Sequence, residues 1–191
     1  MSTADKLIRE AGRLIVNAGY NGFSYAHLAE RLGIRKASIH HHFPSKVDLV
    51  VAVVEQQRAA IREQIAALES GEPDALAQLL AYVDYWKRCI EDQSEPFCLA
   101  GVLAVELPAL PEEVGAAVRG HFNDLGEWLE RVMELGVRQG AIRLELEPET
   151  SAQFFQTAIY GAMVMARAYD DPGKFNFVVD AFLARMRIDR G

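Results

Sequence analysis

Four polar residues near the start of the chain can hydrogen-bond to nucleic-acid bases: Arg35, Lys36, Ser38 and His40. The apolar residues around them, Ile34 and Ile39, are spaced so that both would point into a small core. A short helix here would leave the polar side chains on its outer face. Arginine and lysine recognise guanine in the major groove of DNA, so we expect Arg35 or Lys36 to contact guanine.

A helix and a tight turn must come first to position this stretch. Ser24 is a good N-cap, because its hydroxyl can accept a hydrogen bond from a free backbone N–H of the first turn. Leu28, Ala29 and Leu32 share one face at helical spacing. Gly33 stands where the chain must turn, a position that favours positive φ. The pattern predicts a helix-turn-helix whose second helix enters the major groove.

The next residues predict the start of a long third helix. Pro44 ends the preceding helix, and Ser45 can cap the following one. Asp48 lies three residues after Ser45, which is the spacing of a capping box. Lys46 therefore stands at a helix N-terminus, where free N–H groups and the helix dipole favour an anion. We expect backbone and side chain together to hold a phosphate there.

Residues 3–50 resemble the DNA-binding domain of the TetR family of bacterial transcription regulators. The matching runs are Gly19 to Ser24, Leu28 to Ile34, and Ser38 to Lys46. Two positions depart from the usual pattern of the family. Arg35 stands where a serine or threonine commonly caps the recognition helix, and His40 stands where a tyrosine commonly touches a phosphate. Histidine makes that second contact weaker and dependent on pH.

The resemblance implies a ligand-responsive regulator, most commonly a repressor, rather than an enzyme. Its partners would be double-stranded operator DNA of palindromic sequence, a second copy of the chain in a homodimer, and a small, largely apolar effector that releases the DNA. Residues 1–46 would be the DNA-binding domain, and residues 47–191 a ligand-binding and dimerisation domain. The residues expected to hold phosphates are Ser24, Tyr25, His41 and Lys46.

Charge is divided unevenly along the chain. The 191 residues carry a formal net charge of −7. Residues 1–46 hold seven lysines and arginines against three acids, a net of +4, so the remainder carries −11. A basic module on an acidic body favours directional docking on phosphate over non-specific binding of nucleic acid.

We expect a cytoplasmic protein that does not enter a membrane. The first residues lack the basic and apolar regions of a signal peptide. The least charged long stretch, residues 150–166, is too short and too polar to span a bilayer. Two cysteines, Cys89 and Cys98, do not make a disulfide framework.

The rest of the chain reads as helices. We expect an all-α fold with about nine helices: a three-helix head followed by a helical body. Apolar periodicity and helix-ending residues predict helices, besides those of the helix-turn-helix, over residues 7–18, 45–70, 73–90, 97–107, 111–139, 148–169 and 174–186. No stretch alternates long enough with period two to predict a sheet.

The last two helices predict a dimer interface. Ala158, Ala162 and Ala166 recur every four residues beside Gly161, so another helix can approach closely. Large apolar residues occupy several sides of the same helix, which must therefore be covered on more than one face. A purely monomeric core is the alternative. The predicted interface residues are Phe155, Ala158, Ala162, Met165, Ala166, Phe175, Val178 and Phe182.

The middle of the chain is rich in aromatic and sulfur-containing residues with a few polar tips, which suits an apolar ligand cavity. For any single one of them, core packing is the simpler role. Cys98 stands at the start of a predicted helix, where a thiol pKa is lowered, so it could sense oxidants or electrophiles instead of being a buried apolar residue. The predicted ligand-binding residues are Tyr82, Trp86, Cys89, Phe97, Cys98, His121, Phe122, Trp128, Tyr160 and Met163.

We expect no metal site and no cofactor. His40 to His42 are consecutive, and neighbouring helical residues point about 100° apart, away from any common ion. Two other functions stay open. One is a DNA-binding dimer without a small ligand, controlled by a protein partner or by its own expression. The other is a helical enzyme, for which the acidic cluster around His121 is the only place to look: Glu106, Glu112 and Glu113.

Overall fold

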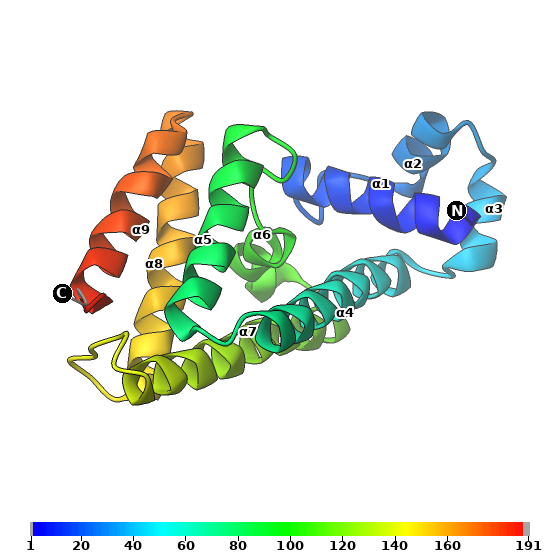
Figure 1. Cartoon of the computed structure of the whole chain (residues 1–191). Helices are drawn as coiled ribbons and strands as arrows, with labels where there is room; N and C mark the ends of the chain where they lie inside the picture. The colour runs from blue at the N-terminus through cyan, green and yellow to red at the C-terminus, as the bar shows by residue number, and fades with distance from the viewer. Residues whose placement is uncertain (1, 189–191) are drawn as a thin grey trace. The chain divides into compact units, whose positions relative to one another are not determined.

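A computed structural model describes residues 2–188, and this part of the chain contains nine α-helices and one 3₁₀ turn (Figure 1). The all-α prediction is confirmed. No helix in the described residues is both long and apolar enough to cross a bilayer. The helices are α1 (Thr3–Ala18), α2 (Tyr25–Leu32), α3 (Lys36–His42), α4 (Lys46–Gly71), α5 (Ala75–Glu91), α6 (Leu99–Glu106), α7 (Glu112–Arg138), α8 (Pro148–Tyr169) and α9 (Pro172–Met186), with the 3₁₀ turn η1 (Leu107–Ala109).

Local capping explains why α5 and α9 begin at other residues than predicted. Helix α5 begins two residues after Pro73, because the carboxylate of Asp74 accepts a hydrogen bond from the amide of Ala77 at 2.9 Å. Helix α9 begins earlier than predicted, at Pro172, because Asp171 caps it by accepting from the amide of Gly173 at 2.8 Å. Helix α8 begins at Pro148, as predicted.

The described residues form two compact units, one of residues 2–61 and 98–122 and the other of residues 62–97 and 123–188. The predicted boundary at residue 46 falls inside the first unit. The apolar side chains of α1 are buried against the first half of α4, helix α6 and the start of α7. Helices α4 and α7 each contribute residues to both units.

The core of the first unit joins α1 to α4, α6 and α7. Leu7, Ile15, Leu49, Leu103 and Val118 are fully buried members of this one cluster. Each such side chain stabilises the fold by about 1.5–3 kcal/mol relative to exposure to water. Burial on this scale fixes the helix-turn-helix on α1 and α4.

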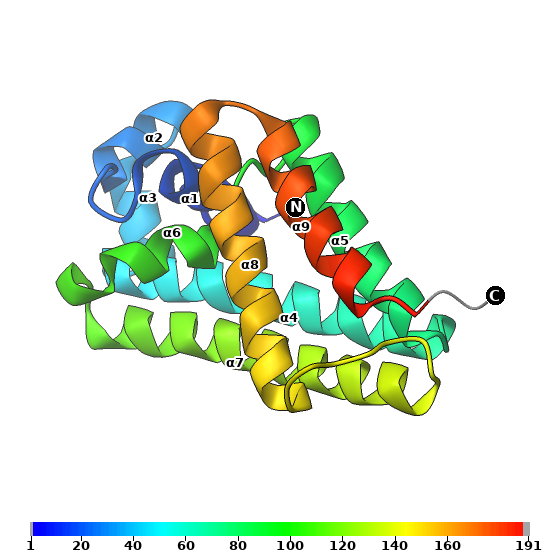
Figure 2. The same cartoon turned by 90° about the vertical axis from the view of Figure 1, so that its left-hand side faces the viewer.

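The second unit is built on an antiparallel pair, α8 and α9, which lie side by side in both views (Figures 1 and 2). The rings of Phe155 and Phe182 meet between them, with centroids 5.4 Å apart. Helix α5 packs on α9, and Lys87 pairs with Asp180 there at 2.6 Å. The loop before α8 is tied to the end of α9, because the amide of Arg143 donates to the carbonyl of Met186 at 2.8 Å.

Candidate nucleic-acid interface

Helices α2 and α3 are joined by the turn that the sequence predicts. The hydroxyl of Ser24 accepts from the amide of His27 at 3.4 Å and so caps α2. Gly33 ends that helix in the left-handed region, with φ 63° and ψ 33°. The amide of Ile34 then donates to the carbonyl of Ala29 at 3.0 Å. A residue with a side chain is strained in that conformation, so glycine fixes the geometry of the turn.

The outer face of α3 is polar and open. Ile39 is fully buried beneath it, whereas Arg35, Lys36 and Ser38 are exposed. Arg35 occupies the N-cap position without a side-chain capping bond, so its guanidinium is not used in the helix. Within residues 2–188, neither Arg35 nor Lys36 forms an ion pair. Both cations therefore keep their charge and hydrogen-bond donors for a ligand.

His40 is held in one orientation. Its Nδ1 lies 3.1 Å from the carbonyl oxygen of Pro44, and its ring meets the edge of the Tyr25 ring at a centroid distance of 4.8 Å. A carbonyl can only accept, so Nδ1 carries the proton of this hydrogen bond. Nε2 remains as an acceptor in the neutral ring and becomes a donor when the ring is protonated. His41 beside it is also exposed.

The structure corrects the prediction that Tyr25 holds a phosphate. Its side chain is buried, and its hydroxyl lies 2.9 Å from the carbonyl of Phe43 and 2.5 Å from that of Ser45. Burial, with smaller contributions from Asp48 and Tyr20, raises the pKa of Tyr25 to about 12. The hydroxyl therefore fastens the connection between α3 and α4.

Lys46 is also engaged within the head. Its Nζ donates to the carbonyl of Phe23 at 2.6 Å and lies 4.5 Å and 4.3 Å from the ring centroids of Tyr20 and Phe23. Burial lowers the pKa of Lys46, and Glu106 acts in the opposite direction. An ammonium has three donors, so a phosphate contact by Lys46 stays a prediction.

The capping box at the start of α4 is confirmed. The amide of Ser45 donates to Oδ2 of Asp48 at 2.9 Å, and the amide of Asp48 donates to Oγ of Ser45 at 3.2 Å.

Two family models match the chain. Residues 7–53 match the model of bacterial regulatory proteins of the tetR family, and residues 75–182 match the tetracyclin repressor-like C-terminal domain. The second match alone covers more than half of the chain. This chain belongs to the TetR family. It is a DNA-binding transcriptional regulator by family.

Relatives match along most of their length. A solved TetR-family regulator from Agrobacterium tumefaciens is 44% identical, with 97% of both chains covered and a TM-score of 0.94. The transcriptional regulator CymR of Pseudomonas putida is 31% identical over 72% of this chain and 68% of its own. The transcriptional repressor NemR of Escherichia coli K12 is 25% identical over 86% of this chain and 84% of its own.

The ten predicted ligand residues of this TetR-family chain divide between the two units. The second unit brings together Tyr82 and Trp128, whose ring centroids are 5.4 Å apart, and it also holds Trp86, Cys89, Phe97, Tyr160 and Met163. In the first unit, Sγ of Cys98 lies 3.7 Å from Nε2 of His121, and both residues are buried. The ring of His121 meets that of Phe122 at 5.4 Å.

Two buried donors in the second unit have no acceptor among residues 2–188. They are the indole nitrogens of Trp86 and Trp128. A buried unsatisfied donor costs about 1–3 kcal/mol. A bound molecule with acceptor atoms at these positions would remove that cost.

Four of the predicted interface residues are corrected. Phe155, Ala162, Ala166 and Phe175 are at most 4% exposed, because they form the core of their own protomer. Met165 is 43% exposed, while Ala158, Val178 and Phe182 are half-buried. Large apolar residues of α8 and α9 outside the predicted set are exposed: Phe154, Val164, Tyr169 and Phe177. Neighbouring side chains of a helix point about 100° apart. A comparison of all positions of α8 around its axis could therefore have separated the buried from the exposed residues of this helix.

The acidic cluster considered for catalysis has structural contacts. Glu106 accepts a hydrogen bond from the amide of Tyr20 at 2.7 Å. Glu112 pairs with Arg119, and His121 contacts Cys98. Glu106 therefore holds the turn between α1 and α2, a role that sequence spacing did not suggest.

Proposed function

We propose that this chain is a ligand-responsive repressor that binds a palindromic operator as a homodimer. The observation that carries the DNA-binding part is the exposed face of α3 above the buried Ile39, where Arg35 and Lys36 form no ion pair with any residue that the structure describes. Arg35 or Lys36 recognises guanine, with Ser38 and His40 beside them in the groove. Ser24 and His41 contact phosphates and set the register. Residues 1–46 are the DNA-binding part.

The effector that suits the second unit is uncharged and carries hydrogen-bond acceptors, such as carbonyl or ether oxygens. Support comes from the unpaired indole donors of Trp86 and Trp128. In the described part of the second unit the buried polar residues are Gln78 and Ser151, neither of them charged. An ionised ligand buried there would lack a counter-charge, which is costly.

Release of DNA follows from a shift of populations. The effector must bind the form that does not fit DNA more tightly than the form that does. Helix α4 carries the change, because its first half belongs to the unit with the head and its second half to the unit with the two tryptophans.

The experiment that tests the DNA-binding part is selection from a random DNA pool by the full-length chain, followed by titration of the selected site across a salt series. A two-fold symmetric motif and steep weakening with salt are the expected results. Arg35→Ala or Lys36→Ala should lower specific affinity roughly 10- to 100-fold. Arg138→Ala removes the same charge from α7 and serves as the matched control. Failure to enrich any motif would overturn the proposal.

A further inference from the structure

The ring of His40, on the exposed face of α3, is held on two sides. Nδ1 lies 3.1 Å from the carbonyl oxygen of Pro44, and the centroid of the ring lies 4.8 Å from that of Tyr25. Tyr25 is itself fixed, because it is buried and its hydroxyl lies against the carbonyls of Phe43 and Ser45. The two ring nitrogens of His40 therefore keep their directions.

The Pro44 carbonyl decides which nitrogen of the neutral His40 ring carries the proton. A carbonyl oxygen only accepts, so the proton lies on Nδ1, and Nε2 keeps a lone pair. Nε2 lies on the other side of the ring from this bond and has no hydrogen-bond partner within residues 2–188. Neutral His40 therefore presents an acceptor to any molecule that lies against α3.

This acceptor has the opposite hydrogen-bonding character to its neighbours on α3. The side chains of Arg35 and Lys36 can only donate. Phosphate oxygens only accept, so the lone pair of Nε2 repels them. A tyrosine, which is common at this position in the TetR family, donates its hydroxyl hydrogen to a phosphate instead. The neutral histidine is therefore suited to another partner than a phosphate.

Amino groups of bases are the partners that suit an acceptor. In the major groove, N6 of adenine and N4 of cytosine donate, whereas O6 of guanine and O4 of thymine accept. A single acceptor at a fixed place on one strand can therefore distinguish the amino bases, adenine and cytosine, from the keto bases, guanine and thymine.

We propose that neutral His40 is a specificity-determining residue, which accepts a hydrogen bond from the amino group of adenine or cytosine at one position of each operator half-site. This rests on the proposed binding of a palindromic operator by α3 and adds the class of base that His40 selects. The hydrogen bond favours amino over keto bases at that position roughly 3- to 10-fold in affinity.

Protonation of His40 reverses its preference. The imidazolium donates from both nitrogens, so it keeps the bond to the Pro44 carbonyl and turns Nε2 into a donor. A donor at this place suits the oxygen of a keto base and opposes an amino group. Histidine is the side chain whose charge ordinarily changes between about pH 5 and 8. The pH of the binding reaction is therefore a direct probe of this contact.

The groups around His40 leave its own ring as the origin of such a change at this base. Tyr25 contacts the ring, and burial raises the pKa of Tyr25 to about 12, so its phenol stays neutral over this range. The carboxylate of Asp48 is held by Ser45, and the ammonium of Lys46 donates to a carbonyl of the α1–α2 turn. The charged or titratable residues of these elements are Tyr25, His27, Glu30 and Arg31 on α2, Arg35, Lys36, His41 and His42 on α3 and its N-cap, and Lys46 and Asp48 on α4.

Selection of operator DNA by the full-length chain at about pH 8 and about pH 5.5 tests the proposal. At the higher pH, one position of each half-site should favour adenine or cytosine. At the lower pH, that position should lose this preference or favour guanine or thymine, while the rest of the motif stays the same. His40→Phe should remove the preference at both pH values. His42→Phe, which removes another exposed histidine of α3, is the matched control and should behave as the wild type.

Modified bases test the contact itself. Replacement of the selected adenine by purine, or of the selected cytosine by 2-pyrimidinone, removes the amino group and keeps the ring. At about pH 8 the wild type should bind the modified operator roughly 3- to 10-fold more weakly, whereas His40→Phe should bind both operators equally. Equal losses in the two proteins would mean that His40 does not bind the amino group.

The wild type alone can overturn the proposal, so the test does not depend on the folding of His40→Phe. A palindromic motif that is identical at the two pH values would leave the regulator in place and remove this role of His40. Failure to enrich any motif at either pH would overturn the proposed operator binding together with it.

Discussion

The carboxylate of Glu106, at the end of α6, accepts a hydrogen bond of 2.7 Å from the backbone amide of Tyr20, at the turn between α1 and α2. The two residues are 86 positions apart in the chain. This contact fastens the helix-turn-helix to α6 within the first unit. The turn therefore depends on a residue outside the DNA-binding segment.

Removal of this acceptor should destabilise the first unit. We expect Glu106→Ala to lower the free energy of unfolding by about 1–3 kcal/mol, because the partly buried Tyr20 amide loses its partner. Glu106→Gln keeps an acceptor and should lose less. Urea titration followed by circular dichroism measures both, with Glu112→Ala, an exposed acid, as the control. If Glu106→Ala and the control are equally stable, the bond to the Tyr20 amide does not stabilise the first unit.

Two glycines with positive φ should respond differently to alanine. Gly33 has φ 63°, and an added Cβ would meet nothing within 4 Å, so Gly33→Ala should cost about 1–2 kcal/mol from backbone conformation alone. Gly19 has φ 73°, and an added Cβ would collide with Oε1 of Glu106. Gly19 also has ψ −178°, a conformation that is essentially restricted to glycine, so Gly19→Ala should be the more destabilising variant in thermal melts for both reasons. The extra destabilisation of Gly19→Ala should shrink when Glu106→Ala is present in the same chain. If it stays unchanged, the collision with Glu106 does not contribute to it.

Stability at high pH should depend on Tyr25. Its pKa is raised to about 12 in the folded chain, against an ordinary value near 10, so the folded state favours the neutral phenol. The stabilisation of the folded state by the neutral Tyr25 phenol is complete below pH 10 and is lost as the pH rises from 10 to 12. Urea titrations over this range should show a smaller decline for Tyr25→Phe than for the wild type. If the free energy of unfolding falls equally with pH in both chains, the ionisation of Tyr25 is not coupled to folding.

The two tryptophans should reveal the chemistry of the effector. Without a ligand, Trp86→Phe and Trp128→Phe should each cost only a small part of the stability, since removal of an unsatisfied donor offsets part of the cost of the cavity that the smaller ring leaves. Calorimetry should find tighter binding of acetophenone than of ethylbenzene or benzoate. Each replacement should weaken acetophenone binding roughly 3- to 10-fold, the effect of one hydrogen bond.

In these experiments ethylbenzene is the control for shape and benzoate the control for charge. If acetophenone binds no better than ethylbenzene, or not at all, the indole donors do not select the effector. Regulation by a protein partner would then be the better account.

Local signals in the sequence predicted most of the helices. Ser24, Gly33 and the Ser45–Asp48 capping box act on neighbouring backbone groups, so their effect can be read without the rest of the fold. Arg35 and Lys36 were placed outward by the same periodicity that buries Ile39.

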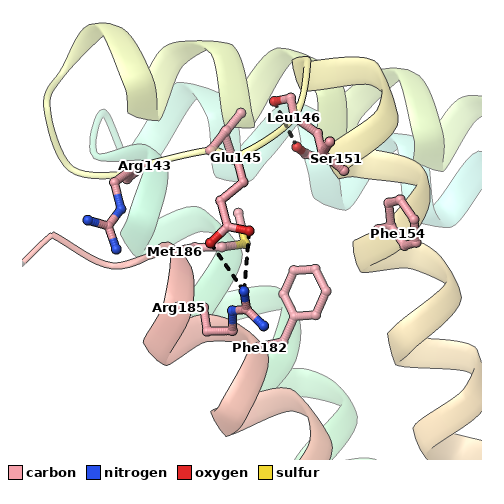
Figure 3. A pocket seen from close by; sticks show the side chains of 9 residues that line it. Arg143, Glu145, Leu146, Ser151, Phe154, Phe182, Arg185 and Met186 are labelled. Atoms are coloured by element: carbon pink, nitrogen blue, oxygen red, sulfur yellow. Dashed lines mark hydrogen bonds and ion pairs between the residues drawn. The ribbon is translucent and has the colours of Figure 1, made fainter.

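The misplaced residues depend on contacts between distant segments. Tyr25 looks available in the sequence, but the α3–α4 connection folds back onto its hydroxyl. The alanine series 158, 162 and 166 predicts a contact face of α8, yet packing within the protomer takes up Ala162 and Ala166 and leaves Phe154, Gly161 and Met165 open. A pocket beside Phe154 (Figure 3) exists because the loop at Arg143 meets Met186, a pairing that no local pattern encodes.

The distribution of the tryptophans has a spectroscopic consequence. The chain has two of them, and both lie in the second unit, while the helix-turn-helix has none. Emission excited at the tryptophan band therefore reports on the second unit alone. If operator DNA bound by the helix-turn-helix changes this emission, the second unit has responded, so an unlabelled sample can time the passage of the signal from one unit to the other.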